Sequence, residues 1–137
     1  MFIVSNQAGV AKGLYSQQTL DAITGRMKEE LGADIVFDGI FYCTHLPDAG
    51  CACRKPKTAF IDSAREIILN EGYSFDPDKS FFVGDSIIDV ETGKAAGLKT
   101  IMVFTGKETA DNAAVWPVKP DFTAADLFKA ADIILQR

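Results

Sequence analysis

Residues 80–97 read SFFVGDSIIDVETGKAAG, and this stretch decides the fold class. Its short apolar start, 80–83, predicts a buried strand that ends at Gly84-Asp85. Residues 88–96 then predict a helix, and Gly97 stops it. A buried strand that leads directly into a helix is the repeating unit of an α/β domain with a mostly parallel sheet.

The same alternation continues outward in both directions. Further strands are expected at 2–4, 35–43, 100–104 and, as a short edge strand, 120–122. Helices are expected after Ser16, over about 60–71 and after Thr123. The last helix carries five apolar residues on one face: Leu127, Phe128, Ala131, Ile134 and Leu135. No linker interrupts the pattern, so residues 1–137 are predicted to form a single domain.

The composition is that of an ordinary globular protein. Of 137 residues, 47% are hydrophobic and 24% are charged, and the formal net charge is −5. An acidic chain without a broad basic face argues against nucleic-acid binding. No apolar run approaches the length of about 20 residues that a membrane helix needs, and no signal-peptide pattern stands at the start. We therefore expect a cytoplasmic protein with no membrane or nucleic-acid partner.

All three cysteines and the single histidine fall within eleven positions, as Cys43, His45, Cys51 and Cys53. Three thiolates and one imidazole form a common tetrahedral zinc set. With four protein ligands no position stays open for substrate, so the predicted zinc is structural and holds the loop 43–53. The alternative is three small buried thiols and an unrelated surface histidine.

Two further groups of charged residues carry chemistry. Arg54 and Lys55 directly follow the last cysteine, where a guanidinium fork and an ammonium suit a phosphate. Asp85 stands at the end of a predicted strand and is a candidate Mg²⁺ ligand, whereas Asp89, one helical turn later, would hold the loop or a metal-bound water. The alternatives are a solvated basic pair, and an N-cap aspartate followed by a surface aspartate.

A fourth group follows the first predicted strand. Ser5, Asn6 and Gln7 stand at its end, and glycines at positions 9 and 13 shape the loop beyond. A hydroxyl and loop amides form a small anion cradle, to which Lys12 adds charge. The alternative is an ordinary turn between strand and helix.

Together, in this order, the four groups resemble the haloacid-dehalogenase (HAD) superfamily of phosphatases. The likeness is to the branch of heptose-1,7-bisphosphate 7-phosphatases and histidinol-phosphatases. Residues 4–13 look like the T-N-Q-S-G-I-A-R-G segment of that branch, and residues 51–56 look like its C-x-C-R-K-P. Residues 83–89, Ala96-Gly97 and 105–107 look like its final motif and closing strand. The resemblance implies a HAD-like Rossmannoid three-layer sandwich.

The resemblance also implies roles for these residues. Ser5 would hydrogen-bond the transferring phosphoryl group, and Lys55 would neutralise its charge. Asp85 would hold the catalytic Mg²⁺. The substrate would be lined by the following residues: Ser5, Asn6, Gln7, Ala8, Arg54, Lys55 and Ser86. Structural Zn²⁺ would be held by Cys43, His45, Cys51 and Cys53.

This chain departs from the family pattern in several places. Ser5 replaces the usual threonine, Ser86 replaces a frequent lysine, and the zinc loop is short. The largest departure is that no D-x-D motif precedes the Ser5 segment. In the family, the first aspartate of that motif is the nucleophile. The strand that carries the motif is the centre of the family's sheet. The resemblance implies that neither Asp85 nor Asp89 replaces that nucleophile, because both would lie on the metal side of the pocket. We expect a truncated or inactive form, and self-association through unpaired sheet edges.

The predicted function follows from these expectations. The complete protein would be a Mg²⁺-dependent phosphatase of carbohydrate metabolism that hydrolyses a small phosphate monoester such as heptose 1,7-bisphosphate. Catalysis by this chain alone is doubtful without the nucleophile. The alternative is a non-catalytic, zinc-stabilised module that binds a phosphorylated ligand or a partner chain. A response-regulator-like or flavodoxin-like domain would share the alternation but would leave the cysteine cluster unexplained.

Overall fold

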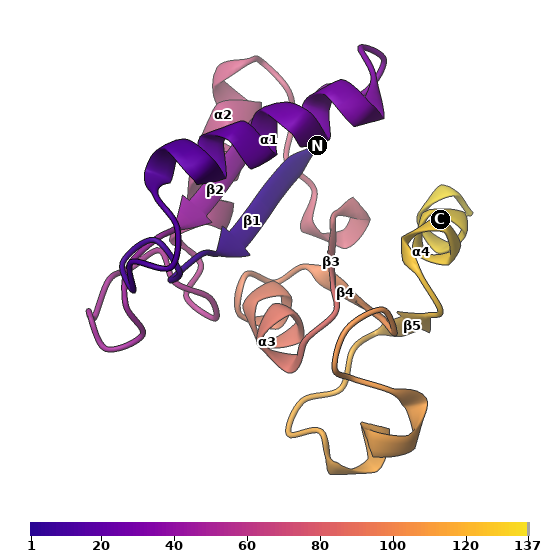
Figure 1. Ribbon diagram of the computed structural model, residues 1–137. Coiled ribbons are helices and arrows are strands. Elements are labelled where there is room, and N and C mark those ends of the chain that lie inside the picture. The colour runs from indigo at the N-terminus through magenta and orange to yellow at the C-terminus, as the bar shows by residue number, and fades with distance from the viewer. Residues whose placement is uncertain (137) are drawn as a thin grey trace. The chain divides into compact units, whose positions relative to one another are not determined.

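The computed structural model describes residues 1–136 (Figure 1). The chain divides into two compact units, which are described separately. Unit 1 comprises Met1–Arg54 and Ala59–Glu71, and unit 2 comprises Lys55–Thr58 and the chain from Gly72 onward. The single domain over residues 1–137 stays a prediction. No helix in the part of the chain that the structure describes is long and apolar enough to cross a membrane.

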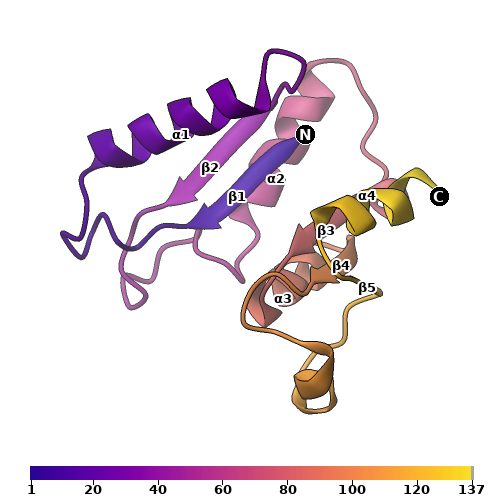
Figure 2. The ribbon, with the colours of Figure 1, turned by 45° about the vertical axis from the view of Figure 1, so that its right-hand side comes forward.

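Unit 1 is a parallel two-stranded sheet with one helix on each face. Its elements in chain order are β1 (Phe2–Asn6), α1 (Gln17–Leu31), β2 (Gly39–Cys43) and α2 (Ala59–Asn70). Strands β1 and β2 pair in the register Phe2↔Gly39 through Asn6↔Cys43. Because neighbouring residues of a strand point to opposite faces, Phe41 and Tyr42 identify which helix covers which face. Phe41 stacks on Phe60 of α2, whereas the Tyr42 hydroxyl bonds to Thr24 of α1, so the two helices cover opposite faces (Figure 2).

The ends of α1 follow the predicted signals. The Ser16 hydroxyl accepts a hydrogen bond from the backbone N–H of Thr19, and Gly32 ends the helix with φ of 81°. The strand expected over 35–43 is shorter than predicted, because β2 begins only at Gly39. Residues Ile35 and Val36 are 42% and 70% exposed. Apolar side chains alone therefore did not decide where this strand begins.

Gly25 lies inside α1, at a position where no neighbouring atom requires a glycine. A Cβ placed there would meet nothing within 4 Å. Glycine in a helix interior is less favourable than alanine by about 0.5–1 kcal/mol, since the unfolded chain loses more freedom. We expect Gly25→Ala to raise the free energy of unfolding by about that amount in urea denaturation.

The matched control for that substitution is Gly32→Ala. Gly32 also has open space around it, but its φ of 81° is one that side-chain-bearing residues rarely adopt. This variant is expected to lose stability. A loss of stability in Gly25→Ala would show that the helix interior needs the glycine for a reason other than geometry.

Unit 2 is a three-stranded parallel sheet of order β3–β4–β5. Its elements are β3 (Phe81–Gly84), α3 (Ile87–Ala95), β4 (Lys99–Val103), β5 (Phe122–Ala124) and α4 (Leu127–Leu135), with short 3-10 helices at Pro77–Lys79 and Ala110–Val115. On one face, Ile101 and Val103 of β4 pack with Ala130 of α4. On the other face, Met102 packs with Val90 of α3. The predicted class, α/β with parallel strands, is confirmed, and the strands are distributed over two sheets.

Helix α4 packs through only part of the predicted face: Ile134 contacts the core as expected, but Ala130 and Ile133 were not predicted. Ala130 is fully buried, and Ile133 and Ile134 pack beside it. Leu127 and Phe128 are 66% and 73% exposed. Because this helix is apolar on most of its circumference, periodicity alone could not identify the buried face.

Asp121 fixes the start of β5 to β4. Its carboxylate accepts hydrogen bonds from the backbone N–H of Thr100 at 2.7 Å and from the Thr100 hydroxyl at 2.8 Å, and it pairs with Lys94. Burial opposes ionisation, but Lys94 and Thr100 outweigh it and lower the pKa of Asp121 below the ordinary aspartate value. The carboxylate therefore stabilises the folded state when it is charged.

This arrangement predicts a pH dependence of stability. A carboxyl group whose folded-state pKa is depressed stabilises above its unfolded pKa, and that stabilisation is lost as the pH falls through the folded pKa. We expect Asp121→Asn to lower the free energy of unfolding at pH 7 by about 1 kcal/mol, since the group is one-third exposed and partly screened. The difference between the two proteins should shrink as the pH falls below the ordinary aspartate value of 3.8. It should vanish once the pH is below the lowered folded-state pKa, because the wild-type carboxyl is then protonated as well. A difference that does not shrink as the pH falls below that ordinary value would contradict this account.

Candidate functional site

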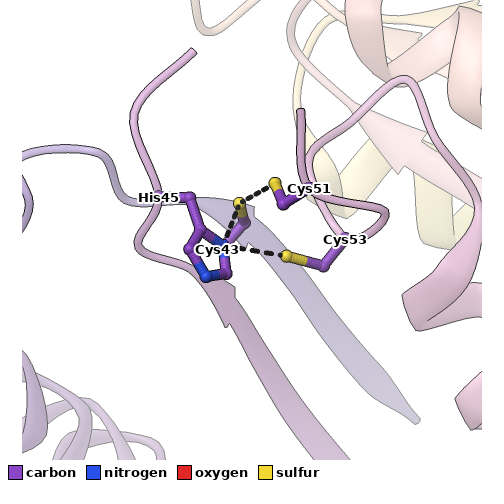
Figure 3. A group of neighbouring side chains, drawn as sticks. All are labelled: Cys43, His45, Cys51 and Cys53. Carbon is purple, nitrogen blue, oxygen red and sulfur yellow. Dashed lines mark hydrogen bonds between the residues drawn. The ribbon is translucent and has the colours of Figure 1, made fainter. Parts of the chain in front are cut away.

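The four candidate zinc ligands come together at the end of β2 (Figure 3). Cys43 is the last residue of that strand and is fully buried, and the other three residues lie in the loop that follows. Cys43 Sγ is 3.6 Å from both His45 Nδ1 and Cys51 Sγ. Cys53 Sγ is 3.3 Å from His45 Nδ1, and all four ligand atoms lie within 4.8 Å of one another.

These separations suit one tetrahedral metal ion. With Zn–S about 2.3 Å and Zn–N about 2.0 Å, tetrahedral geometry places ligand atoms about 3.5–3.8 Å apart. The two distances from Cys43 Sγ, to His45 Nδ1 and to Cys51 Sγ, fall in that range, and the distance between Cys53 Sγ and His45 Nδ1 is slightly shorter. The donor set and its spacing therefore fit a closed Cys₃His site.

The thiols of the cluster affect one another's ionisation. Burial alone would raise the pKa of Cys51, but hydrogen bonds with the Cys43 thiol and the Arg54 backbone lower it to about 7. Burial raises the pKa of Cys53 to about 12, and the neighbouring thiols Cys43 and Cys51 add to that increase. Several thiolates at this distance repel one another, so a bound cation would favour their joint ionisation.

In unit 2, Lys55 and Asp89 form a nearly buried ion pair. Lys55 Nζ donates to Asp89 Oδ1 at 2.6 Å, and the two side chains are only 12% and 6% exposed. The other carboxylate oxygen, Oδ2, accepts from the hydroxyl and the backbone N–H of Ser86, at 2.6 and 3.2 Å. Asp89 thus bonds both to Ser86 in the loop after β3 and to the Lys55 ammonium.

Asp85 stands at the carboxyl end of β3, between strand and helix, with its side chain exposed. Two glycines make room for the carboxylates here. A Cβ on Gly106 would lie 2.4 Å from Asp85 Oδ2, and a Cβ on Gly84 would lie 2.3 Å from Asp89 Cβ. Neither glycine is replaceable without moving a carboxylate.

In unit 1, Ser5 is part of a short hydrogen-bond chain. Gln7 Nε2 donates to Ser5 Oγ at 2.9 Å, and the Tyr15 hydroxyl donates to Gln7 Oε1 at 2.6 Å. The Gln7 backbone N–H donates to the Cys43 carbonyl, which extends the pairing of β1 with β2 by one residue. Asn6 ends β1, and Ala8 begins the loop, where its carbonyl accepts from the backbone N–H of Lys12.

Arg54, at the end of the cysteine loop, has an unsatisfied donor. Its Nη1 is buried, and no residue within the described range 1–136 accepts a hydrogen bond from it. A buried donor without an acceptor is costly, and an anionic ligand would satisfy it.

The predicted site residues thus fall into two groups. Unit 1 holds Ser5, Asn6, Gln7, Ala8, Arg54 and the four cysteine-loop ligands, and unit 2 holds Lys55, Asp85, Ser86 and Asp89. The pattern D-x-D occurs at Asp76-Pro77-Asp78, but it precedes β3, where Asp76 caps the 3-10 helix. It therefore lies at the opposite end of the strand from Asp85.

Sequence reasoning missed Tyr15, and it gave no role to Gly84 and Gly106, although both glycines stand in the quoted motifs. A tyrosine eight residues after a glutamine has no periodicity that would predict their contact. The two glycines were visible in the sequence, but only the distance from a built Cβ to a neighbouring carboxylate shows why each is needed.

Comparison with known proteins gives a consistent family. A family model described as HAD-hydrolase-like matches residues 52–130. D-glycero-D-manno-heptose-1,7-bisphosphate 7-phosphatase of Chlorobaculum tepidum is 35% identical over 136 residues, which cover 93% of this chain and 68% of that protein. The corresponding enzyme of Pseudomonas aeruginosa, for the β-anomer, is 40% identical over 108 residues, which cover 77% and 57%.

Solved structures agree with this family. The crystal structure of D,D-heptose 1,7-bisphosphate phosphatase from B. bronchiseptica, complexed with magnesium and phosphate, superposes with a TM-score of 0.81 at 34% identity and covers 98% of this chain and 73% of that one. A HAD-like phosphatase structure from Mesorhizobium loti, at 24% identity and a TM-score of 0.66, shares the fold. The chain spans 57% to 73% of the length of the three heptose bisphosphate phosphatases compared above. On the family match to more than half of its residues and on relatives at this identity, the chain belongs to the HAD hydrolase superfamily, in the branch of the heptose-1,7-bisphosphate 7-phosphatases.

Proposed function

We propose that this chain carries the phosphate-binding and metal-binding side of a Mg²⁺-dependent phosphatase that acts on a phosphosugar, with heptose 1,7-bisphosphate as the substrate. The observation that carries the proposal is the nearly buried Lys55–Asp89 pair beside the exposed carboxylate of Asp85. The relatives named as heptose bisphosphate phosphatases support the choice of substrate. A cytoplasmic location stays a prediction.

Each residue of unit 2 has a task in this proposal. Asp89 and Ser86 hold the Lys55 ammonium in place, so that its charge is oriented before a phosphate arrives. Asp85 offers a carboxylate of the kind that Mg²⁺ prefers in combination with phosphate and water. The bound cation would neutralise charge on the phosphoryl oxygens. Taken by itself, unit 1 would donate hydrogen bonds to a phosphate group from Ser5 and Arg54.

The nucleophile is the part of the chemistry that residues 1–136 do not provide. We propose that hydrolysis needs the first aspartate of a D-x-D segment, and that the described residues bind phosphate without turning it over. The second candidate function is a non-catalytic module that binds a phosphorylated ligand. The buried, unsatisfied Nη1 of Arg54 favours it, because an anionic ligand would satisfy that donor.

We further propose that the cysteine loop holds structural Zn²⁺ through Cys43, His45, Cys51 and Cys53. The spacing of their ligand atoms supports it. The metal would order the loop that leads to Arg54. Self-association through sheet edges also stays a prediction.

The experiment measures phosphate release from heptose 1,7-bisphosphate with and without Mg²⁺. It compares the 137-residue chain with a fusion in which the D-x-D segment of the Chlorobaculum tepidum relative precedes residue 1. We expect no turnover by the chain alone, Mg²⁺-dependent turnover by the fusion, and loss of that turnover in fusion variants Lys55→Ala and Asp85→Ala. A fusion that binds phosphate without turnover would favour the binding module. Turnover by the chain alone would contradict the assignment of the nucleophile.

A further inference from the structure

We propose that Tyr15 is a positioning residue for Ser5: it orients the Gln7 side chain so that the Ser5 hydroxyl hydrogen stays available for a phosphoryl oxygen. The inference rests on the proposed function, because it assumes that Ser5 donates to phosphate. It goes beyond that function by adding a residue to which neither the quoted motifs nor the proposed function gives a role.

The lengths of the two hydrogen bonds that Gln7 makes, to Tyr15 and to Ser5, indicate which way its side-chain amide is oriented. The bond from Tyr15 to Gln7 is 2.6 Å long, which is typical of O–H···O, and the bond from Gln7 to Ser5 is 2.9 Å long, which is typical of N–H···O. The amide oxygen therefore faces the tyrosine and the amide nitrogen faces the serine.

This orientation decides the role of the serine hydroxyl. Because Gln7 Nε2 donates to Ser5 Oγ, the serine is an acceptor in that bond, and its own hydrogen is left for another acceptor. With the amide reversed, Ser5 would donate its hydrogen to Gln7 Oε1 instead. The hydroxyl would then be a poorer donor to a phosphoryl oxygen.

The loop after β1 folds back on itself, so that the Tyr15 side chain contacts Gln7. Four backbone hydrogen bonds close it, from Val10 to Gln7, from Lys12 to Ala8, from Gly13 to Val10 and from Leu14 to Gly9. Gly9 leaves space for the ring, since a Cβ there would lie 2.2 Å from Tyr15 Cε1 and 2.7 Å from its hydroxyl. The glycine in this loop thus serves the tyrosine, and Tyr15 is itself half-buried.

The test is a double-mutant cycle on the binding of inorganic phosphate, with Mg²⁺ present, measured by calorimetry on the full chain. Tyr15→Phe keeps the ring and removes only the hydroxyl. We expect it to weaken phosphate binding about fivefold in the wild-type background. In the Ser5→Ala background it should have no further effect, because the hydroxyl that Tyr15 orients is gone.

The control variant is Tyr42→Phe. It also removes a tyrosine hydroxyl from a side-chain hydrogen bond in unit 1, but that hydroxyl bonds to Thr24, at 2.8 Å, and not to the Gln7 side chain. Its phosphate affinity should equal that of the wild type. The positioning role alone would be overturned if Tyr15→Phe left the phosphate affinity at the wild-type value. It would also be overturned if Tyr15→Phe lowered the phosphate affinity by the same factor in the wild-type and Ser5→Ala backgrounds. A wild-type chain that binds no phosphate would overturn the proposed function, and the positioning role with it.

Discussion

Cys53→Ser is expected to lower the apparent free energy of unfolding by at least about 4 kcal/mol in the presence of zinc. A ligand at a thousandfold excess over its dissociation constant stabilises the folded state by this amount. The reason is that only the folded chain brings the four ligand atoms within 4.8 Å of one another. The same loss should follow when the wild-type protein is stripped by a strong chelator. Metal content, measured by mass spectrometry, should be one zinc per wild-type chain.

The control for this variant lies next to the ligand. Ala52→Ser adds a hydroxyl to an exposed residue between Cys51 and Cys53 and should leave both zinc content and stability unchanged. Two results together would contradict the zinc site: a wild-type chain that contains no zinc, and a Cys53→Ser variant with an unchanged free energy of unfolding. The cluster would then be a group of packed thiols, which is the alternative stated in the sequence analysis.

Lys55→Met is expected to destabilise the protein by about 3–5 kcal/mol, because it leaves a buried carboxylate without its cation. Asp89 is only 6% exposed, and Ser86 provides it with hydrogen bonds but no positive charge. Adding Asp89→Asn to Lys55→Met removes the unpaired charge and should restore part of the stability. Urea unfolding of the two single variants and the double variant gives the coupling between them.

An exposed pair provides the comparison. Lys129 and Asp132 lie 3.1 Å apart but are 60% and 45% exposed, so Lys129→Met should change stability by less than about 1 kcal/mol. Equal effects of Lys55→Met and Lys129→Met would mean that the Lys55–Asp89 pair is not buried in solution.

The sequence predicted most clearly the features that depend on local chemistry. The strand before Gly84-Asp85, the Ser16 cap and the Gly32 stop all follow from side-chain type at a given position. The cysteine loop was predicted because every cysteine and the only histidine lie close together in the sequence.

Features that depend on tertiary pairing were predicted less well. The last strand was expected at 120–122 and the helix cap at Thr123, but pairing with β4 places the strand at Phe122–Ala124, and Asp126 caps α4. Thr123 and Asp126 are both residue types that form N-caps, but Thr123 pairs with Met102 in the sheet, and Asp126 caps the helix. The Tyr15–Gln7 contact depends on a loop that closes on itself, which no residue pattern shows.

The most direct test of the central claim is a ³¹P NMR titration of the chain with inorganic phosphate, in the presence and absence of Mg²⁺, for wild type and Asp85→Asn. We expect one phosphate to bind per wild-type chain, and only when Mg²⁺ is present. Replacing Asp85 should abolish this Mg²⁺-dependent binding. Binding that is indifferent to both Mg²⁺ and Asp85, or no binding at all, would contradict this expectation.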